Sequence, residues 1–341
     1  MPSLEAAPVR VPAAPGRVVD FPADTALVVE AGGWVVEGGQ STRGWHFYEH
    51  FIRCPRLFGF AELGMLDQEN SPPLVRGTLL HLGLGQWRAR RIAEEIEAGR
   101  LPSSALPTFG GQPVTRKAQL ASPLAAVAAA VELGVKRGGL LFEQVWRGIH
   151  RRVVDALRAY VARYGDEPVR PFLIERELRA GMDGAPHFAG RFLYTQRLDW
   201  AVEDADGIWW IYDIKGVAWL SPQVIDRYTL SGQFLGFAEL GRRVWGARFG
   251  GCYLDLVGFG KELELERVRV PVAPGAQPRF VRDLAWHEGQ RRALEEAGVP
   301  LDQYPGRWSE FTCRTPYGPC PAFDLCRFGA AAGGDDGDAL G

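Results

Sequence analysis

The chain has 341 residues, 46% of them hydrophobic, which predicts one large or two modest globular domains with a real core. Its formal net charge of −2 excludes a globally basic nucleic-acid binder, so any such role must depend on a local patch. The sequence contains neither a membrane-length apolar run nor the pattern of a secretory signal, so we expect a cytoplasmic protein with no membrane partner.

Residues 1–40 are rich in proline, alanine and glycine, so we expect an irregular amino-terminal arm. Residues 41–63 differ from this arm in composition, being rich in aromatic residues, and predict a helix. The dipeptide Cys54-Pro55 interrupts this helix, because proline cannot continue a helix from the preceding turn. A free cysteine is more often a small core residue than a ligand, so Cys54 gains meaning only from partners elsewhere.

The next helix is predicted over residues 71–100, where a serine and two prolines precede an amphipathic run. One face carries His81, which is more commonly a core histidine than a metal ligand, and Gly77 one turn earlier would allow a close backbone approach. Residues 101–165 follow as a helical insertion that begins with a loop. The end of this insertion, residues 145–164, is basic and amphipathic. A solvated face is its common explanation, yet it is also the best local candidate for a phosphate-facing surface.

Two strand-like stretches come next. Residues 172–180 alternate so that Glu175 and Glu177 share one face, where either could add a carboxylate to a site. Residues 190–216 predict a β-hairpin, because both flanks are rich in aromatic and branched residues and Asp204–Gly207 between them has turn chemistry.

The register of this hairpin decides whether it carries a site. A three-residue loop with Gly207 in the left-handed conformation places Asp199 opposite Asp213, whereas a two-residue loop places Asp199 opposite Tyr212 and sends the carboxylates to opposite faces. We predict the first register, in which Lys215 shares the face of both carboxylates. An Asp/Lys pair is commonly a solvated face, but this strand is too apolar for that, and buried ionised groups require a partner. Two carboxylates and an ammonium predict a divalent-metal site with a cation beside it.

A helix over residues 222–245 follows and places Gln233 and Phe237 on one face at i and i+4. Beyond it we expect a strand pair and a further helix, over residues 250–258, 263–272 and 280–297. Residues 329–341 predict a disordered tail.

The five cysteines of a cytoplasmic chain argue for metal, cluster or core use rather than disulfides. Cys313, Cys320 and Cys326 lie in a stretch broken by proline and glycine, and three thiolates leave a tetrahedral or cubane site one ligand short. Cys54 is the obvious fourth donor. Unrelated reduced thiols are the alternative, since the spacing matches no standard zinc-finger pattern.

Taken in order, these motifs resemble the RecB-like branch of the PD-(D/E)XK nucleases. The resemblance spans about residues 45–328 and is strongest to iron–sulfur members such as the AddB nuclease domain and the CRISPR adaptation exonucleases. The motifs that carry it are the Cys54-Pro55 helix, Gly77-Thr78-Leu79-Leu80-His81, Asp199, Asp213-Ile214-Lys215, Gln233-x-x-x-Phe237 and the cysteine triplet of residues 313–326. It implies an α/β fold with a restriction-endonuclease-like core over residues 41–328. In this core a mixed central sheet is flanked by helices, and an iron–sulfur cluster brackets the ends.

The resemblance also implies the site residues. The expected ligands of Mg²⁺ or Mn²⁺ are His81, Asp199, Asp213 and the carbonyl of Ile214. The expected catalytic residues are Asp199, Asp213 and Lys215, and the residues expected to bind DNA are Gln233 and Phe237. A [4Fe–4S] cluster, with Zn²⁺ as the alternative, would be held by Cys54, Cys313, Cys320 and Cys326. The chain departs from the family pattern at Phe237, where a tyrosine is usual, and in the first gap of the cysteine triplet. The glycine that is usual near the first aspartate is either replaced by Gln196 or displaced to Gly190.

We therefore expect a metal-dependent DNA nuclease, more an exonuclease than an endonuclease, that acts on single-stranded DNA or free ends in recombination, repair, or phage or CRISPR DNA processing. A helicase or recombination protein is the expected protein partner. The alternative is a catalytically silent DNA-binding or scaffold subunit of a helicase–nuclease complex, which the near-neutral charge favours. An iron–sulfur redox enzyme is less well supported, because no flavin or nicotinamide fingerprint is present.

Overall fold

The computed structural model describes residues 26–29, 34–37, 43–66, 72–100, 108–109, 112–113, 140–167, 170–183, 191–273, 275–315 and 318–328. The chain divides into two compact units. The first unit comprises Met1–Trp45, Glu69–Met182 and Leu193–Val281, and the second comprises His46–Gln68, Asp183–Phe192 and Arg282–Gly341. Within the described ranges, no helix combines the length and the apolar character needed to cross a bilayer.

A five-stranded mixed sheet forms the centre of the first unit, with the strand order β5-β6-β7-β8-β9. β6 and β7 are antiparallel, β7 and β8 are parallel, and β8 and β9 are antiparallel. The strands are β5 (Arg170–Asp183), β6 (Arg191–Glu203), β7 (Trp209–Val217), β8 (Phe249–Phe259) and β9 (Leu263–Val270). β7 is apolar almost throughout because both of its faces are covered.

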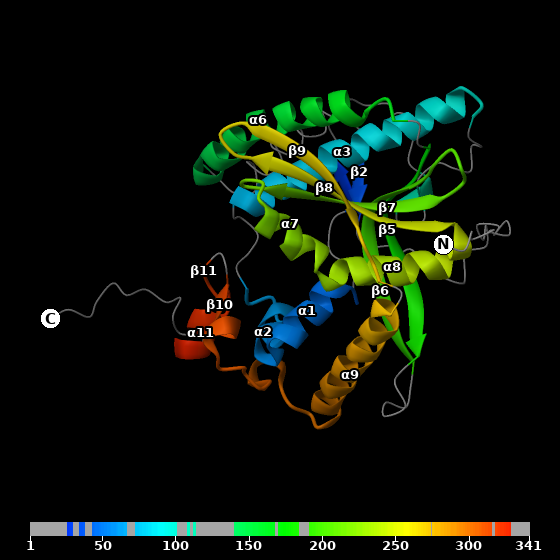
Figure 1. The fold of residues 1–341 in the computed structure, drawn as a ribbon. Helices are drawn as coiled ribbons and strands as arrows, with labels where there is room; N and C mark the ends of the chain where they lie inside the picture. Colours follow the sequence, from blue (N-terminus) through cyan, green and yellow to red (C-terminus); the bar gives the residue numbers. More distant parts are fainter. Residues whose placement is uncertain are drawn as a thin grey trace. The chain divides into compact units, whose positions relative to one another are not determined.

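Helices cover the two faces of this sheet (Figure 1). On one face lie α3 (Pro72–Glu97) and α6 (Leu140–Tyr164), and on the other α7 (Pro222–Thr229) and α8 (Gly232–Trp245). Apolar residues of α3 and α6 form one buried cluster with Ile214 of β7 and Val257 of β8. Full burial of one such aliphatic side chain stabilises the fold by about 1.5–3 kcal/mol. The predicted mixed sheet flanked by helices is therefore confirmed.

The predicted single helix over residues 222–245 is wrong, because the chain breaks it into α7 and α8. Ser231 caps α8, and its Oγ accepts a hydrogen bond from the amide of Gln233 at 3.2 Å. Gly232 follows the cap at a point where any Cβ would collide with the ring of Trp45. The break therefore aims the first turn of α8, with Gln233, at β7.

The amino-terminal arm is not wholly irregular as expected. β1 (Ala26–Val29) and β2 (Trp34–Glu37) pair antiparallel, because both are short runs of branched or aromatic residues. The rest of residues 1–40 and the expected tail 329–341 lie outside the described residues. Of the insertion over residues 101–165, the structure describes α6, two short paired strands, β3 (Thr108–Phe109) and β4 (Gln112–Pro113), and a few residues after α6.

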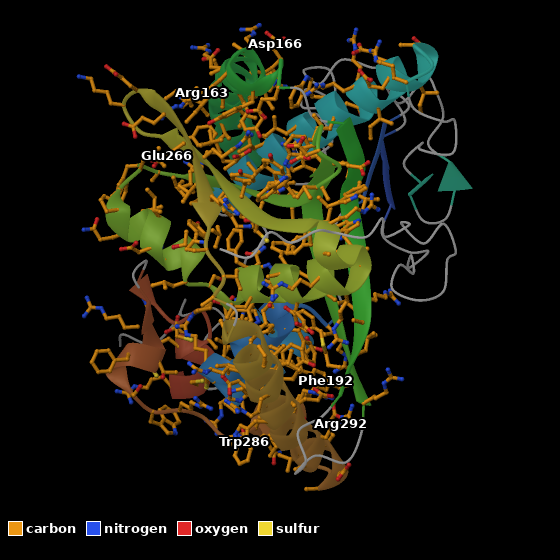
Figure 2. The ribbon with its side chains drawn as sticks, turned by 45° about the vertical axis from the view of Figure 1, so that its right-hand side comes forward. Arg163, Asp166, Phe192, Glu266, Trp286 and Arg292 are labelled. Carbon is orange, nitrogen blue, oxygen red and sulfur yellow. The ribbon has the colours of Figure 1, made fainter. Side chains whose placement is uncertain are left out.

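The described part of the second unit is mainly helical. Its elements, some of which begin in the first unit, are α1 (Trp45–Arg53), α2 (Pro55–Glu62), α9 (Ala276–Glu296), α10 (Glu310–Cys313), α11 (Phe323–Phe328) and the paired β10 (Arg314–Thr315) and β11 (Gly318–Pro319). Cys54 is extended and Pro55 opens α2, which confirms the predicted interruption. Figure 2 shows Arg292 on α9 near Phe192, and Arg292 donates to the carbonyl of Arg191 at 3.2 Å.

Candidate functional site

The β6–β7 hairpin of the first unit has the register that brings two aspartates together. Its ladder pairs Trp200 with Tyr212, and Asp199 and Asp213 lie one step beyond that pair. Gly207 closes the turn with a φ of +76°, the left-handed conformation that a three-residue bulged loop requires. The predicted register is therefore confirmed, and the alternative two-residue loop is excluded.

Asp199 holds together three parts of the site. Its Oδ2 accepts a hydrogen bond from the amide of Ile214 at 2.6 Å, so it bridges directly onto β7. Its Oδ1 lies 3.2 Å from Nδ1 of His81, which α3 supplies. The structure therefore places His81 beside the first predicted carboxylate.

Asp213 is almost completely buried and has two side-chain partners. Lys215 Nζ lies 3.0 Å from Oδ1 and 2.9 Å from Oδ2, and Gln233 Nε2 donates to Oδ1 at 2.8 Å. Oδ2 has no aligned hydrogen bond among the described residues, although the lysine nitrogen is close to it. A buried carboxylate oxygen without a hydrogen bond is costly unless a cation binds to it.

Burial and nearby charges shift the pKa values of the two carboxylates in opposite directions. Burial raises the pKa of Asp213 to about 6, and Asp199 adds to this rise while Lys215 opposes it. Burial acts in the same direction on Asp199, but His81, Lys215 and the Ile214 amide outweigh it and hold its pKa below the usual range. Burial would lower the pKa of Lys215, yet the two carboxylates raise it well above its usual value. Lys215 is therefore an ammonium that neutralises only part of the negative charge.

The donors of this cluster suit a hard divalent cation. Two carboxylates, a backbone carbonyl at Ile214 and one imidazole match the preference of Mg²⁺ and Mn²⁺ for oxygen-rich sites. Across the described residues, no three His, Cys, Asp or Glu side chains are spaced to hold a metal ion. The oxygens of Asp199 and Asp213 are instead turned toward partners within the protein. The fit therefore depends on the donor chemistry and on the Asp213 Oδ2 atom that lacks a hydrogen bond.

We expect divalent-cation binding to weaken as the pH falls through about 6. The proton and the cation compete for Asp213, whose raised pKa brings protonation into a mildly acidic range where an ordinary aspartate stays ionised. Affinity should be nearly constant above that pH and fall by about tenfold per pH unit below it. Calorimetric titration with Mn²⁺ across this range measures the effect, with exposed Asp226→Asn as the control. A flat profile down to pH 5 would contradict the raised pKa.

The structure does not bring every predicted residue into the cluster. Glu177 is buried, its Oε1 accepts from Arg179 Nε at 2.7 Å, and it completes no three-ligand group among the described residues. The side chain of Glu175 lies outside the described residues. Phe237 is fully buried, which corrects the expectation that it contacts DNA. The first turn of α8 reaches Asp213, whereas Phe237, one turn later, packs into the core against Phe234.

Gly77 also differs from the expectation of a close backbone approach. No atom of the described residues lies within 4 Å of the position that its Cβ would take, so among these residues this part of α3 faces open space. The reason is that the buried face of α3 is formed by neighbouring aliphatic residues such as Leu79 and Leu80. The open space lies one turn before His81.

Two hydrogen bonds made by Tyr194 and Gln196 set the position of Gln233, and no sequence motif indicates them. Tyr194 Oη donates to Gln196 Oε1, and Gln196 Nε2 donates to the carbonyl of Gln233, both at 2.8 Å. Gly236 is required beside them, because a Cβ there would collide with both Tyr194 and Gln196. The departure at Gln196 therefore has a structural role: it anchors the helix turn that reaches Asp213.

A buried network of hydrogen bonds and ion pairs around Arg88 was also not predicted from the sequence. The Arg88 guanidinium carbon lies 3.3 Å from the centroid of the Trp200 ring, and Nη2 donates to the hydroxyl of Tyr160 at 3.0 Å. Tyr160 donates in turn to Asp255, which pairs with Arg267. These contacts tie α3, which carries His81, to β6, which carries Asp199.

Figure 2 shows two of the elements that this network joins. Arg163 and Asp166 mark the end of α6, and Glu266 lies on β9 next to the network residue Arg267. Arg267 also binds Glu167 through its Nη1, at 2.6 and 2.7 Å from the two carboxylate oxygens. The network is therefore balanced in charge, as buried ions require.

Four thiols line one cavity of about 270 Å³ in the second unit, and they are Cys54, Cys313, Cys320 and Cys326. Arg307 connects two of them: its amide donates to Cys54 Sγ at 3.4 Å, and its carbonyl lies 3.7 Å from Cys313 Sγ. Burial raises the pKa of Cys320 and Cys326, and the neighbouring thiols raise it further. The structure therefore brings the four predicted cysteines to one cavity, although no three described thiols are spaced to hold an ion.

Comparison with known proteins was made at three levels. A family model described as the PD-(D/E)XK nuclease superfamily matches residues 47–327. A search of the curated proteins found no significant match. Among solved structures, a protein from Eubacterium rectale that is provisionally described as an exonuclease is 13% identical, with a TM-score of 0.42 over 80% of this chain and 86% of that one. A second, SSO0001, is 13% identical, with a TM-score of 0.27 over 50% and 76% of the two chains. Similarity at these scores carries no argument about function.

Proposed function

The chain belongs to the PD-(D/E)XK nuclease superfamily, and from this premise we propose that it is a metal-dependent deoxyribonuclease that digests single-stranded DNA from a free end. The observation that carries the proposal is the cluster itself. Three elements supply its residues. His81 of α3 contacts Asp199 of β6, and Asp199 accepts a hydrogen bond from the Ile214 amide of β7. Asp213 and Lys215, on either side of Ile214, contact each other. A buried group of this kind, with pKa values shifted in opposite directions, is typical of a catalytic site.

The charge of the substrate explains why a cation is needed. A phosphodiester is an anion, and two carboxylates would repel it unless they were neutralised. The residues that would hold Mg²⁺ or Mn²⁺ are His81, Asp199, Asp213 and the carbonyl of Ile214. When bound, the cation supplies positive charge beside the phosphate and lowers the pKa of a water molecule.

Lys215 would then act on the phosphate or on the attacking water. Without a cation, the two carboxylates raise its pKa and keep it an ammonium. An ammonium suits stabilising the charge that develops on phosphate oxygens better than accepting a proton. Gln233 holds Oδ1 of Asp213 and leaves Oδ2 without an aligned hydrogen bond in the described part of the chain. Lys215 Nζ lies 2.9 Å from this oxygen, so a cation that binds Oδ2 would displace the ammonium toward the substrate.

We also propose that the four cysteines of the second unit hold a [4Fe–4S] cluster, with Zn²⁺ as the alternative. Their arrangement around one cavity supports this. Metal binding requires thiolates, and burial raises the pKa of Cys320 and Cys326 even though Arg53 and Arg56 oppose this rise, so the metal itself would have to displace the thiol protons. A cluster there would cross-link Cys54, at the start of α2, to the three carboxyl-terminal cysteines, which are far away in the chain.

A catalytically silent DNA-binding subunit of a helicase–nuclease complex is the second candidate. The formal charge of −2 favours it, because most non-specific DNA affinity comes from Lys and Arg, and a chain that is not basic overall would gain from a partner. A helicase or recombination protein is the partner that we propose in either case.

A cleavage assay tests the proposal. The protein is incubated with end-labelled single-stranded and double-stranded DNA, and with circular single-stranded DNA, in Mn²⁺, in Mg²⁺ and in EDTA. We expect metal-dependent release of label from linear single strands, no reaction in EDTA, and an intact circle because it has no end. Cleavage of the circle would indicate an endonuclease, and intact linear DNA under all conditions would favour the silent subunit.

A further inference from the structure

Two arginines from different helices meet at the turn between β8 and β9 in the first unit. Arg76 of α3 stacks on the ring of Phe259, with its guanidinium carbon 4.7 Å from the ring centroid. Arg152 of α6 donates a hydrogen bond to the carbonyl of Gly260. Phe259 and Gly260 are consecutive, so the two guanidinium groups lie at the same turn, and we call them the Arg76/Arg152 pair.

The Arg76/Arg152 pair forms no direct ion pair in the part of the chain that the structure describes. Neither guanidinium forms an ion pair with a described carboxylate, and Arg76 Nε is buried without a hydrogen-bond partner there. Burial lowers the pKa of Arg76, and the like charge of Arg152 lowers it further. By contrast, Arg158 on the same helix as Arg152 has its own carboxylate, with Nη1 3.7 Å from Oδ1 of Asp155. Two adjacent cations that lack an anion form an arrangement that a bound anion would stabilise.

The Arg76/Arg152 pair lies near the carboxyl-terminal end of β7, on the face of the sheet that α3 and α6 cover. Arg76 Nε is 3.9 Å from the point where a Cβ on Gly216 would lie. Gly216 directly follows Lys215 in β7, so Arg76 and Lys215 lie on opposite sides of this strand. The phenol of Tyr228 on α7 acts electrostatically on both Arg76 and Lys215, which places it near the two cations. Gly77, the next residue after Arg76, has no described atom within 4 Å of the place that its Cβ would take, so the described residues leave space next to the two arginines.

We propose that Arg76 and Arg152 bind a phosphate of the nucleic-acid strand outside the catalytic cluster, on the side of β7 opposite to Lys215. This inference rests on the proposed nuclease function and adds a second phosphate subsite to it. A planar guanidinium group can donate two parallel hydrogen bonds to phosphate oxygens. Stacking on Phe259 fixes the orientation of the Arg76 guanidinium. The subsite also gives a role to the basic helix α6, which contributes Arg152.

Binding in the absence of chemistry tests the subsite. The affinity of the full chain for a fluorescent single-stranded oligonucleotide is measured in EDTA over a range of salt concentrations. Arg76→Gln and Arg152→Gln should each weaken binding, and each should reduce the slope of log affinity against log salt by about 0.7, the value for one lost phosphate contact on a single strand. With Mn²⁺ present, the same changes should raise KM more than they lower kcat.

Two variants act as controls. Arg158→Gln removes an exposed arginine of α6 that is already paired with Asp155, so affinity and salt slope should stay at wild-type values. Arg76→Lys keeps the charge without the planar fork, so it should restore the salt slope that Arg76→Gln loses. Thermal melting of each variant separates a lost contact from a damaged fold.

The outcomes distinguish this inference from the proposed function. Wild-type salt slopes in both Arg→Gln variants would overturn the subsite, even if the protein cleaves DNA. A wild-type chain that shows no salt-dependent binding of the oligonucleotide would also overturn it. Reduced slopes in a protein that never cleaves DNA would support the subsite and reject the nuclease.

Discussion

Replacing Lys215 by methionine will abolish DNA cleavage and leave the divalent cation bound. Lys215 is the only described ammonium of the cluster, 2.9 Å from Asp213 Oδ2, and it competes with a metal ion for that oxygen. Its removal takes away the charge that we propose stabilises the substrate phosphate, while both carboxylates remain. We expect a loss of about 100- to 10,000-fold in kcat, in the range of positioned proton-transfer and charge-stabilising groups. Single-turnover cleavage and Mn²⁺ titration of the same preparation measure the two effects.

Asp213→Asn is the matched contrast to this variant. It should lose cation binding together with cleavage, because the amide cannot replace a carboxylate as a ligand for a hard cation. Asp226→Asn, which changes an exposed aspartate of α7, should retain both properties. Undiminished cleavage by Lys215→Met, or tight Mn²⁺ binding by Asp213→Asn, would reject the roles given to these residues.

Changing Cys320 to alanine will remove the metal centre that we propose for the second unit and destabilise that unit by several kcal/mol, on the order expected when bound metal supplies folding free energy. The wild-type protein, purified without oxygen, should be brown with absorbance near about 400 nm, as thiolate-bound iron clusters are. The Cys320→Ala protein should be colourless, contain no iron and melt at a lower temperature.

The fifth cysteine provides the control for this experiment. Cys252 is fully buried in β8 of the first unit, so Cys252→Ala should keep its iron and its colour whatever it does to the stability of the sheet. A colourless wild-type protein with one zinc ion would replace the cluster by the zinc alternative. A wild-type protein without metal, whose melting temperature is unaffected by Cys320→Ala, would reject both.

Much of the candidate site could be read from local sequence. The turn chemistry around Gly207 determines the loop length, the loop length determines the register, and the register sets Asp199 opposite Asp213. Lys215 then follows from the alternation of side chains along a strand. These inferences succeed because each step depends on residues that are close together in the chain.

The contacts that complete the site were decided by tertiary structure. His81 meets Asp199, and Gln233 meets Asp213, because a helix packs at a particular position against the sheet, and no local signal sets that position. The burial of Phe237 and the open space at Gly77 were missed for the same reason.

The amino-acid sequence by itself determined the hairpin, its register, the carboxylates with their lysine, and the order of the family's motifs. Only the tertiary structure decided how α3 brings His81 against Asp199, where α7 ends and α8 begins, and how a buried arginine network holds α3 against β6. The physical reason is the range of the interactions. Turn geometry and strand alternation act over a few residues, whereas helix packing, buried ion pairs and a cavity shared by distant cysteines exist only after segments far apart in the chain have met.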